Sequence, residues 1–159
     1  MVNMKKYKNR IVSHKIIPER KATYSIFPER LSDDLKNYLS RSGIKKLYSH
    51  QVEMFDKALD GNNVVITTST ASGKTLSFLL PIVEEILKDP TTRAIFIYPT
   101  KALASDQYRN LKPLLDYFGK NIIQAGVYDG DTPVNERTRI RNSANIILTN
   151  PEMINTAFL

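Results

Sequence analysis

Gly73, Lys74 and Thr75 close a loop of small residues in the stretch VVITTSTASGKT, which begins at Val64. Small side chains let a backbone curl so that successive N–H groups point inward, and a following helix adds the positive end of its dipole. A lysine and a hydroxyl at the end of such a loop supply a mobile cation for terminal phosphates and a ligand for magnesium. The spacing therefore predicts a cradle for a nucleoside triphosphate.

The predicted phosphate loop extends from residue 69 to residue 75. Its expected nucleotide-binding residues are Ser69, Thr70, Ala71, Ser72, Gly73, Lys74 and Thr75. Of these, Lys74 and Thr75 are the expected catalytic residues, and Thr75 is the expected magnesium ligand. The general phosphate-loop pattern places a glycine where this sequence has Thr68, so a chance Gly-Lys-Thr in a surface turn is the alternative.

Hydrophobic periodicity predicts the elements that position this loop. Four apolar segments read as strands, namely NVVITT, RAIFIYP, NIIQAGVY and ANIILTN. The first three strands precede helices predicted over Lys74 to about Lys88, Lys101 to about Phe118, and onward from near Pro133. Two shorter helices upstream are predicted to begin at the capping residues Ser32 and Ser49. Apolar strands that alternate with helices favour an α/β fold with a mainly parallel sheet flanked by helices.

Ligands of open α/β sheets bind beyond the carboxyl ends of the strands, and three further loops lie there. Their sequences are PTKA, DGDTP and TNPEM. In the second loop, Asp129 ends an apolar strand, which leaves two interpretations open. Asp129 and Asp131 shape a turn around Gly130, or Asp129 holds magnesium while Asp131 acts as a base.

Charge and composition bound the function class. Residues 1–30 hold eight Lys or Arg and two Glu, so most of the net charge of +7 is N-terminal. A basic arm over residues 1–23, with Tyr7 among its lysines, either attracts a polyanion or is a solvated tail. The 159 residues contain no cysteine, which excludes disulfides and thiolate zinc sites. His14 and His50 lack metal-ligand spacing, so His50 is interpreted as structural. The most apolar window is interrupted by Pro81, so no membrane segment and a cytoplasmic location are expected.

ASGKT, PTKALA and TNPEM, in this order, resemble the phosphate loop and the first nucleic-acid-contacting motifs of superfamily 2 helicases of the DEAD/DEAH-box type. The segment GIKKLYSHQ, which ends at Gln51, resembles the adenine-reading Q motif of the same family. LYSHQ, TASGKT and YDGDTP together are most similar to the YprA/MrfA-like branch of DNA repair helicases. The resemblance covers about residues 24–159.

This resemblance implies a RecA-like P-loop NTPase domain over residues 24–159, incomplete at its C-terminus, that binds ATP and Mg²⁺. It implies that Gln51 hydrogen-bonds the adenine edge, because its amide carries both a donor and an acceptor. Phe27 lies one residue nearer to the Q motif than the family's stacking aromatic, so stacking and core packing both remain open for it. The implied nucleic-acid-binding residues are Thr100, Lys101, Gly130, Thr149 and Asn150.

The family also uses parts that the sequence does not contain, namely a later Asp-Glu pair, a coupling motif and arginine fingers from a second RecA-like lobe. We therefore expect the N-terminal part of an ATP-dependent helicase, either a natural truncation or a cut piece, without turnover of its own. Its expected partners are single-stranded or duplex nucleic acid, DNA rather than RNA, and the second lobe. The alternatives are a non-catalytic nucleotide- or nucleic-acid-binding fragment and a small-molecule kinase with the same loop.

Overall fold

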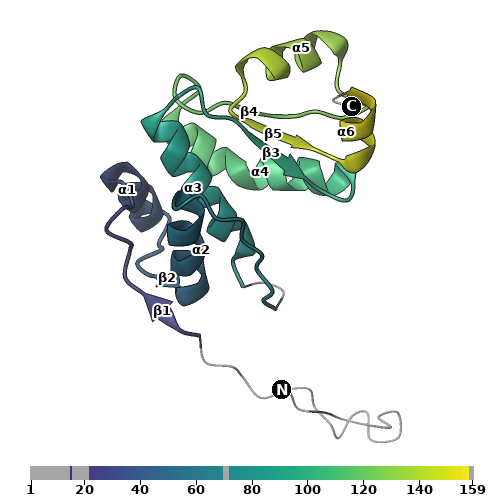
Figure 1. The fold of residues 1–159 in the computed structure, drawn as a ribbon. Coiled ribbons are helices and arrows are strands. Elements are labelled where there is room, and N and C mark those ends of the chain that lie inside the picture. The colour runs from purple at the N-terminus through teal and green to yellow at the C-terminus, as the bar shows by residue number, and fades with distance from the viewer. Residues whose placement is uncertain (1–14, 16–21, 70–71, 158–159) are drawn as a thin grey trace, which may run out of the picture.

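A computed structural model gives the structure of residue 15 and of residues 22–69 and 72–157 (Figure 1). The elements in chain order are β1 (Tyr24–Ser25), α1 (Asp33–Arg41), β2 (Leu47–Tyr48), α2 (Ser49–Leu59), α3 (Lys74–Lys88), β3 (Ala94–Ile97), α4 (Lys101–Phe118), β4 (Ala125–Val127), α5 (Val134–Ser143), β5 (Ile146–Thr149) and α6 (Pro151–Ala157). Most of the predicted basic arm, including Tyr7 and His14, lies outside the described residues, as do Thr70 and Ala71 of the predicted phosphate loop.

Three parallel strands form the main sheet in the order β3-β5-β4. Ile147 of β5 lies opposite Ile95 of β3 on one side and Gly126 of β4 on the other. Each of these strands precedes a helix, so the loops that follow them lie at the same edge of the sheet. The predicted parallel pattern is confirmed for these three strands. The predicted helices over 74–88 and 101–118 are confirmed at both ends.

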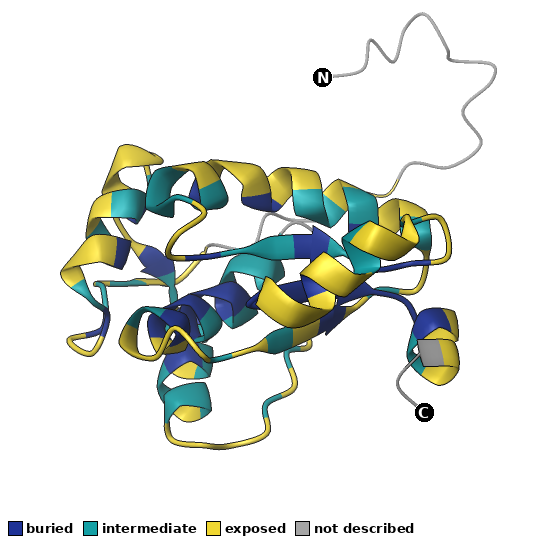
Figure 2. Cartoon of the chain, turned by 90° about the horizontal axis from the view of Figure 1, so that it is seen from above, coloured by how far each residue is buried: buried dark blue, intermediate teal, exposed yellow. Residues whose placement is uncertain are grey.

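Central strand β5 is buried at every position, because helices cover both of its faces (Figure 2). Its successive side chains enter two different clusters, as the alternation of a strand requires. Ile146 and Leu148 join the larger cluster, to which α1 to α4 contribute. Ile147 joins a smaller cluster with Ile140 of α5 and Met153 of α6. Burial of each such side chain stabilises the fold by about 1.5–3 kcal/mol. The strand that carries the fourth predicted loop is therefore fixed from both sides.

The predicted first strand, NVVITT, is wrong. Residues 62–69 form neither helix nor strand, and they do not belong to either sheet of the described residues. Val65 is 86% exposed, Val64 and Ile66 are half-buried, and all three line a groove beside α2. An apolar, β-branched sequence supplies strand propensity, but a strand also needs a partner that completes its ladder of hydrogen bonds. The segment that leads into the phosphate loop has no such strand partner among the described residues.

The predicted N-cap of α1 is confirmed, and the predicted N-cap of α2 is wrong. Ser32 accepts a hydrogen bond from the backbone at the start of α1, as predicted. Ser49 was expected to cap the next helix, but it is the first helical residue of α2, and the N-cap is Tyr48. The Tyr48 N–H donates to Oε1 of Gln51 at 2.9 Å, so a glutamine at the third helical position satisfies the backbone there.

Candidate nucleotide and nucleic-acid site

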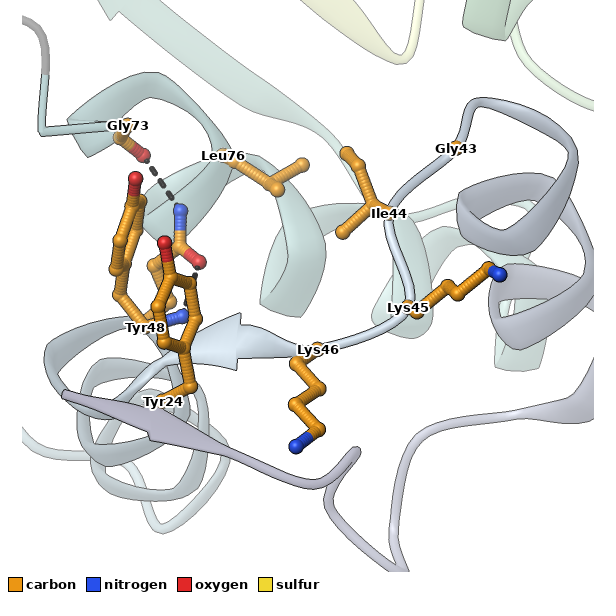
Figure 3. Close-up of a pocket in the computed structure, with 9 residues that line it drawn as sticks. Tyr24, Gly43, Ile44, Lys45, Lys46, Tyr48, Gly73 and Leu76 are labelled. Atoms are coloured by element: carbon orange, nitrogen blue, oxygen red, sulfur yellow. Dashed lines mark hydrogen bonds between the residues drawn. The ribbon is translucent and has the colours of Figure 1, made fainter. Parts of the chain in front are cut away.

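A pocket of about 510 Å³ lies beside the small β1–β2 sheet and the first turns of α2 and α3 (Figure 3). It is lined by Tyr24, Gly43, Ile44, Lys45, Lys46, Tyr48, Gln51, Gly73 and Leu76. Tyr24 and Tyr48 pair across the two strands, and their rings stack with centroids 4.9 Å apart. Hydrogen bonding to the Tyr48 side chain raises the pKa of Tyr24 above its ordinary value. The pocket thus presents an aromatic wall to a planar ligand.

Phe27 does not line this pocket; it is half-buried and packs against the main hydrophobic cluster. Of the two roles left open for it, core packing is therefore confirmed. The aromatic wall comes instead from Tyr24 and Tyr48, which sequence reasoning did not identify as site residues. The pairing of two short strands brings the two tyrosines together, and no spacing rule in the sequence predicts that pairing.

Gln51 joins the pocket to the phosphate loop. Its side chain is buried, and Nε2 donates to the carbonyl oxygen of Gly73 at 3.0 Å, while Oε1 accepts from Tyr48 (Figure 3). A primary amide has two N–H donors and two acceptor lone pairs, so one of each remains for a ligand. The structure therefore places Gln51 at the pocket with unused hydrogen-bonding capacity. Its contact with adenine stays a prediction.

Gly73 is required by the backbone at the end of the loop. It caps α3 with a φ of 75°, the left-handed region that favours glycine. A Cβ at this position would lie 2.6 Å from Nε2 of Gln51. The backbone conformation therefore disfavours a larger residue, and a side chain here would displace the Gln51 amide. The loop is held against α2 at this point.

Lys74 folds back over the loop that precedes it. Its Nζ donates to the carbonyl oxygens of Thr68 and Ser69, at 2.8 and 2.6 Å. Thr68 and Ser72 close the loop further through a hydroxyl contact of 2.6 Å. Phosphate oxygens are charged acceptors and bind an ammonium more strongly than neutral carbonyls do. Lys74 is thus positioned to exchange its hydrogen bonds to loop carbonyls for hydrogen bonds to phosphate oxygens. Thr75, which is half-buried, follows it in the first turn of α3.

His50 contacts the same loop. Its Nε2 lies 3.0 Å from the carbonyl oxygen of Ser72, and its ring stacks on Tyr48 with 5.5 Å between centroids. The interpretation of His50 as structural missed this contact with the candidate site. Its place directly before Gln51 in LYSHQ is the signal that sequence reasoning had available.

At the edge where the strands end, the structure brings together Lys101, Gly130 and Asp131. Lys101 Nζ lies 3.2 Å from both carboxylate oxygens of Asp131. A Cβ on Gly130 would lie 3.1 Å from the same Nζ. Thr100 caps α4, because its hydroxyl oxygen accepts from the N–H of Leu103 at 3.2 Å. Lys101 is therefore near the edge of the sheet, but an acidic partner holds it.

Thr149 and Asn150 hold the loop after β5. Thr149 is fully buried, and its hydroxyl donates to the carbonyl oxygen of Tyr128 at 2.7 Å. Asn150 is 4% exposed, and its Oδ1 accepts from the N–H of Met153 at 2.8 Å, which caps α6. Both side chains are used to fix this loop. Their direct contact with nucleic acid stays a prediction.

Asp129 shapes a turn, as the first of its two interpretations predicts. Its buried Oδ1 accepts from the backbone N–H groups of Asp131 and Thr132 and from the hydroxyl of Thr132, at 2.9 to 3.0 Å. These hydrogen bonds use Oδ1 of Asp129 to organise the turn. The alternative role of Asp129 as the magnesium-holding residue stays a prediction.

Within residues 22–69 and 72–157, no helix has the length and apolarity needed to cross a membrane. A family model described as DEAD/DEAH box helicase matches residues 48–159.

This chain belongs to the DEAD/DEAH box helicase family. The ATP-dependent helicase YprA of Bacillus subtilis (strain 168), named as uncharacterized, is 40% identical over 157 residues, which are 99% of this chain and 21% of the relative. The ATP-dependent helicase hrq1 of Schizosaccharomyces pombe is 40% identical over 159 residues, which cover 96% of this chain and 15% of the relative. The chain thus spans about a fifth or less of the length of these curated DEAD/DEAH relatives.

Solved helicase structures share the fold. The crystal structure of the DUF1998 helicase MrfA bound to DNA and AMPPNP superposes with a TM-score of 0.87 at 39% identity, over 98% of this chain and 22% of that one. More distant helicase structures at 20% identity share the architecture, with TM-scores of 0.66 and 0.71. The predicted RecA-like α/β fold and the predicted similarity to the YprA/MrfA-like branch are confirmed.

Proposed function

We propose that this chain is the ATP-binding N-terminal lobe of an ATP-dependent helicase that acts on nucleic acid, and on DNA in particular. The observation that carries the proposal is Gln51, whose amide contacts both the aromatic pocket and the phosphate loop. Family membership supports it, and so does the similarity to a helicase structure that contains DNA and AMPPNP.

In this proposal, each part of ATP has its own part of the site. The adenine ring lies against the stacked Tyr24 and Tyr48, where an aromatic face favours a flat ring. The remaining N–H and lone pair of Gln51 recognise the adenine edge. The triphosphate follows the loop to Lys74, whose ammonium leaves the carbonyls of the loop for phosphate oxygens. The glycine at position 73 lets the backbone approach the ligand closely.

Magnesium enters this site with the nucleotide. Mg²⁺ keeps several waters and binds through one or two protein oxygens together with substrate phosphates. Thr75, in the first turn of α3, supplies one such oxygen. The cation, when bound, neutralises phosphate charge.

The nucleic-acid strand runs along the edge formed by the loops after β3 and β4. Thr100 begins α4 there, and the N–H groups at a helix start attract phosphates. Lys101 adds a positive charge beside Gly130, where the missing side chain leaves the backbone accessible. The loop after β5 supports this edge from within through Thr149 and Asn150.

We propose further that turnover requires parts of a longer protein. The 159 residues contain no Asp-Glu pair, and activation of the attacking water and of the metal accounts for many powers of ten in rate. A second lobe that closes on ATP and reopens after hydrolysis converts the chemistry into movement along the strand. The chain alone binds ATP without appreciable hydrolysis.

Calorimetric titration of the purified, folded chain with Mg-ATP tests the proposal. We expect saturable heat and perturbed amide resonances for Ser72, Gly73, Lys74 and Thr75. Absence of both in a demonstrably folded sample contradicts nucleotide binding. Single-stranded DNA binding is expected to weaken steeply as salt rises, because phosphate contacts release counterions. Hydrolysis above background that is lost in Lys74→Ala contradicts the claim of inactivity, and phosphate transfer to a metabolite indicates a kinase instead.

A further inference from the structure

We propose that His50 is a positioning residue for the phosphate loop, and that it sets the direction of the peptide between Ser72 and Gly73. The inference rests on the proposed binding of a nucleotide at this loop. It concerns a side chain that neither the predicted metal chemistry nor the predicted adenine recognition uses.

The first turn of α2 holds two consecutive carbonyls of the loop. His50 Nε2 lies 3.0 Å from the oxygen of Ser72, and Gln51 Nε2 lies 3.0 Å from the oxygen of Gly73. A backbone carbonyl only accepts hydrogen bonds, so the neutral imidazole must carry its hydrogen on Nε2. The two side chains are neighbours in sequence and bind neighbouring peptides.

The two carbonyls differ in how firmly they are fixed. The oxygen of Gly73 also accepts from the N–H of Leu76, at 3.1 Å, so α3 itself orients this peptide. Among the described residues, the carbonyl oxygen of Ser72 has one hydrogen bond, which is to His50. Gly73, with a φ of 75°, has the widest backbone freedom of any residue type. The Ser72–Gly73 peptide can therefore rotate unless its carbonyl is anchored.

The direction of this peptide determines where a phosphate donor points. In a planar trans peptide the C=O and the N–H point to opposite sides. Because the Ser72 carbonyl is directed at His50 on α2, the N–H of Gly73 is directed away from α2. Loops of this kind bind phosphates through such inward N–H groups. Rotation of the peptide would replace a donor with a carbonyl oxygen that repels phosphate.

The pocket wall holds the imidazole in place. The His50 ring lies nearly parallel to Tyr48, at an interplanar angle of 10°, and Tyr48 is stacked in turn on Tyr24. The ring stack fixes the orientation of His50, while the Nε2–H group fixes the loop. These two contributions can be separated by substitution.

His50→Phe keeps a flat ring on Tyr48 but removes the donor. His50→Gln gives up the ring but carries an N–H₂ group at a similar reach. We expect His50→Phe to weaken Mg-ATP binding about three- to tenfold, the usual net worth of one hydrogen bond. Adenosine affinity should stay within about twofold of the unsubstituted chain, because the base pocket is intact. His50→Gln should recover Mg-ATP affinity to within about twofold.

The experiment measures Mg-ATP and adenosine affinities for the unsubstituted chain, both His50 variants and Lys74→Ala, with melting temperatures as a folding control. Unchanged Mg-ATP affinity in His50→Phe, with a loss in Lys74→Ala, overturns this inference and leaves the proposed function intact. Equal losses for Mg-ATP and adenosine also overturn it, because they indicate a general structural role. If neither the unsubstituted chain nor Lys74→Ala binds Mg-ATP, the proposed function itself fails.

A measurement on the unsubstituted chain removes any dependence on how the variants fold. Nitrogen chemical shifts of the His50 ring report which nitrogen carries the hydrogen in the neutral form. We expect the Nε2–H tautomer. A ring protonated only at Nδ1 cannot donate to Ser72 and overturns the inference.

Discussion

The loop that precedes α3 and the turn that follows β4 are both short and rich in small polar residues, but they are held in opposite ways. Side chains of α2 and of Lys74 hold the phosphate loop by binding its backbone carbonyls; the α2 residues are His50 and Gln51. The buried carboxylate of Asp129 holds the turn after β4 by binding the backbone N–H groups of that turn. A loop held by exchangeable side-chain contacts can change partners when a ligand arrives. A turn organised by its own buried carboxylate is part of the fold.

The largest effect of this difference is expected for Asp129→Ala. The substitution removes the buried acceptor of the Asp131 N–H, whereas Thr132 still reaches the carbonyl oxygens of Asp129 and Val127, so we expect the unfolding free energy to fall by about 1–3 kcal/mol. Urea denaturation measures the change. Asp129→Asn is the matched control, because it retains Oδ1 and should lose much less. If both variants keep full stability but lose Mg-ATP binding, Asp129 does not stabilise the turn. The proposed difference between the two loops is then wrong.

Lys74→Ala tests the other side of the comparison. The ammonium is bound to loop carbonyls and to the Thr68 hydroxyl, all within the loop, so its removal should lower Mg-ATP affinity about 10- to 150-fold, as expected for hydrogen bonds to charged groups. The melting temperature should change by no more than about 2–4 °C, which corresponds to roughly 1 kcal/mol. Lys57→Ala, which removes an exposed ion pair with Glu53 on α2, is the control and should leave binding unchanged. A melting temperature that falls in step with affinity would show that this loop, too, is part of the fold.

Thr149→Val sharpens the comparison at the loop after β5. The variant keeps the shape of the side chain but loses the buried hydrogen bond to the Tyr128 carbonyl, so we expect a loss of about 1–2 kcal/mol in urea denaturation. Single-stranded DNA affinity should be preserved. The opposite pattern, weaker DNA binding at unchanged stability, would support the prediction that Thr149 contacts nucleic acid.

The sequence predicted the fold well where local and tertiary signals agree. The helices over 74–88 and 101–118 were predicted correctly because amphipathic periodicity and caps such as Thr100 act within a few residues. The strand predicted before the phosphate loop is wrong, because strand pairing depends on a partner that no local sequence pattern specifies. Val65 has the type of a buried strand residue and is exposed.

The candidate site was predictable in part for the same reason. Lys74 and Gln51 follow from short motifs with a chemical rationale. Tyr24 could not be assigned, because its role depends on the pairing of β1 with β2. The contact of His50 depends on the approach of α2 to the loop, although its position beside Gln51 in LYSHQ indicated that it lies near the site. The burial of Thr149 could not be predicted, because a residue at the end of a strand has the same local sequence whether its side chain points to the ligand edge or into the core.

The smallest expected effect concerns the ion pair between Lys101 and Asp131, which links the start of α4 to the turn after β4. The Asp131 side chain is 82% exposed, and exposed pairs contribute about 0–1 kcal/mol, so Asp131→Asn should leave stability almost unchanged. It removes a negative charge beside Lys101, and single-stranded DNA affinity should rise about two- to fivefold at low salt, with the gain shrinking as salt screens the charges.

Asp106→Asn is the matched control for this last variant, because it removes an exposed carboxylate that pairs with Arg109 within α4. An equal gain in both variants would reflect net charge alone. A gain confined to Asp131→Asn places the strand beside Lys101, because a Coulomb interaction with a phosphate is large only at short range in water. No gain in either variant would remove Lys101 from the nucleic-acid path and would leave the start of α4, at Thr100, as the remaining contact on this edge.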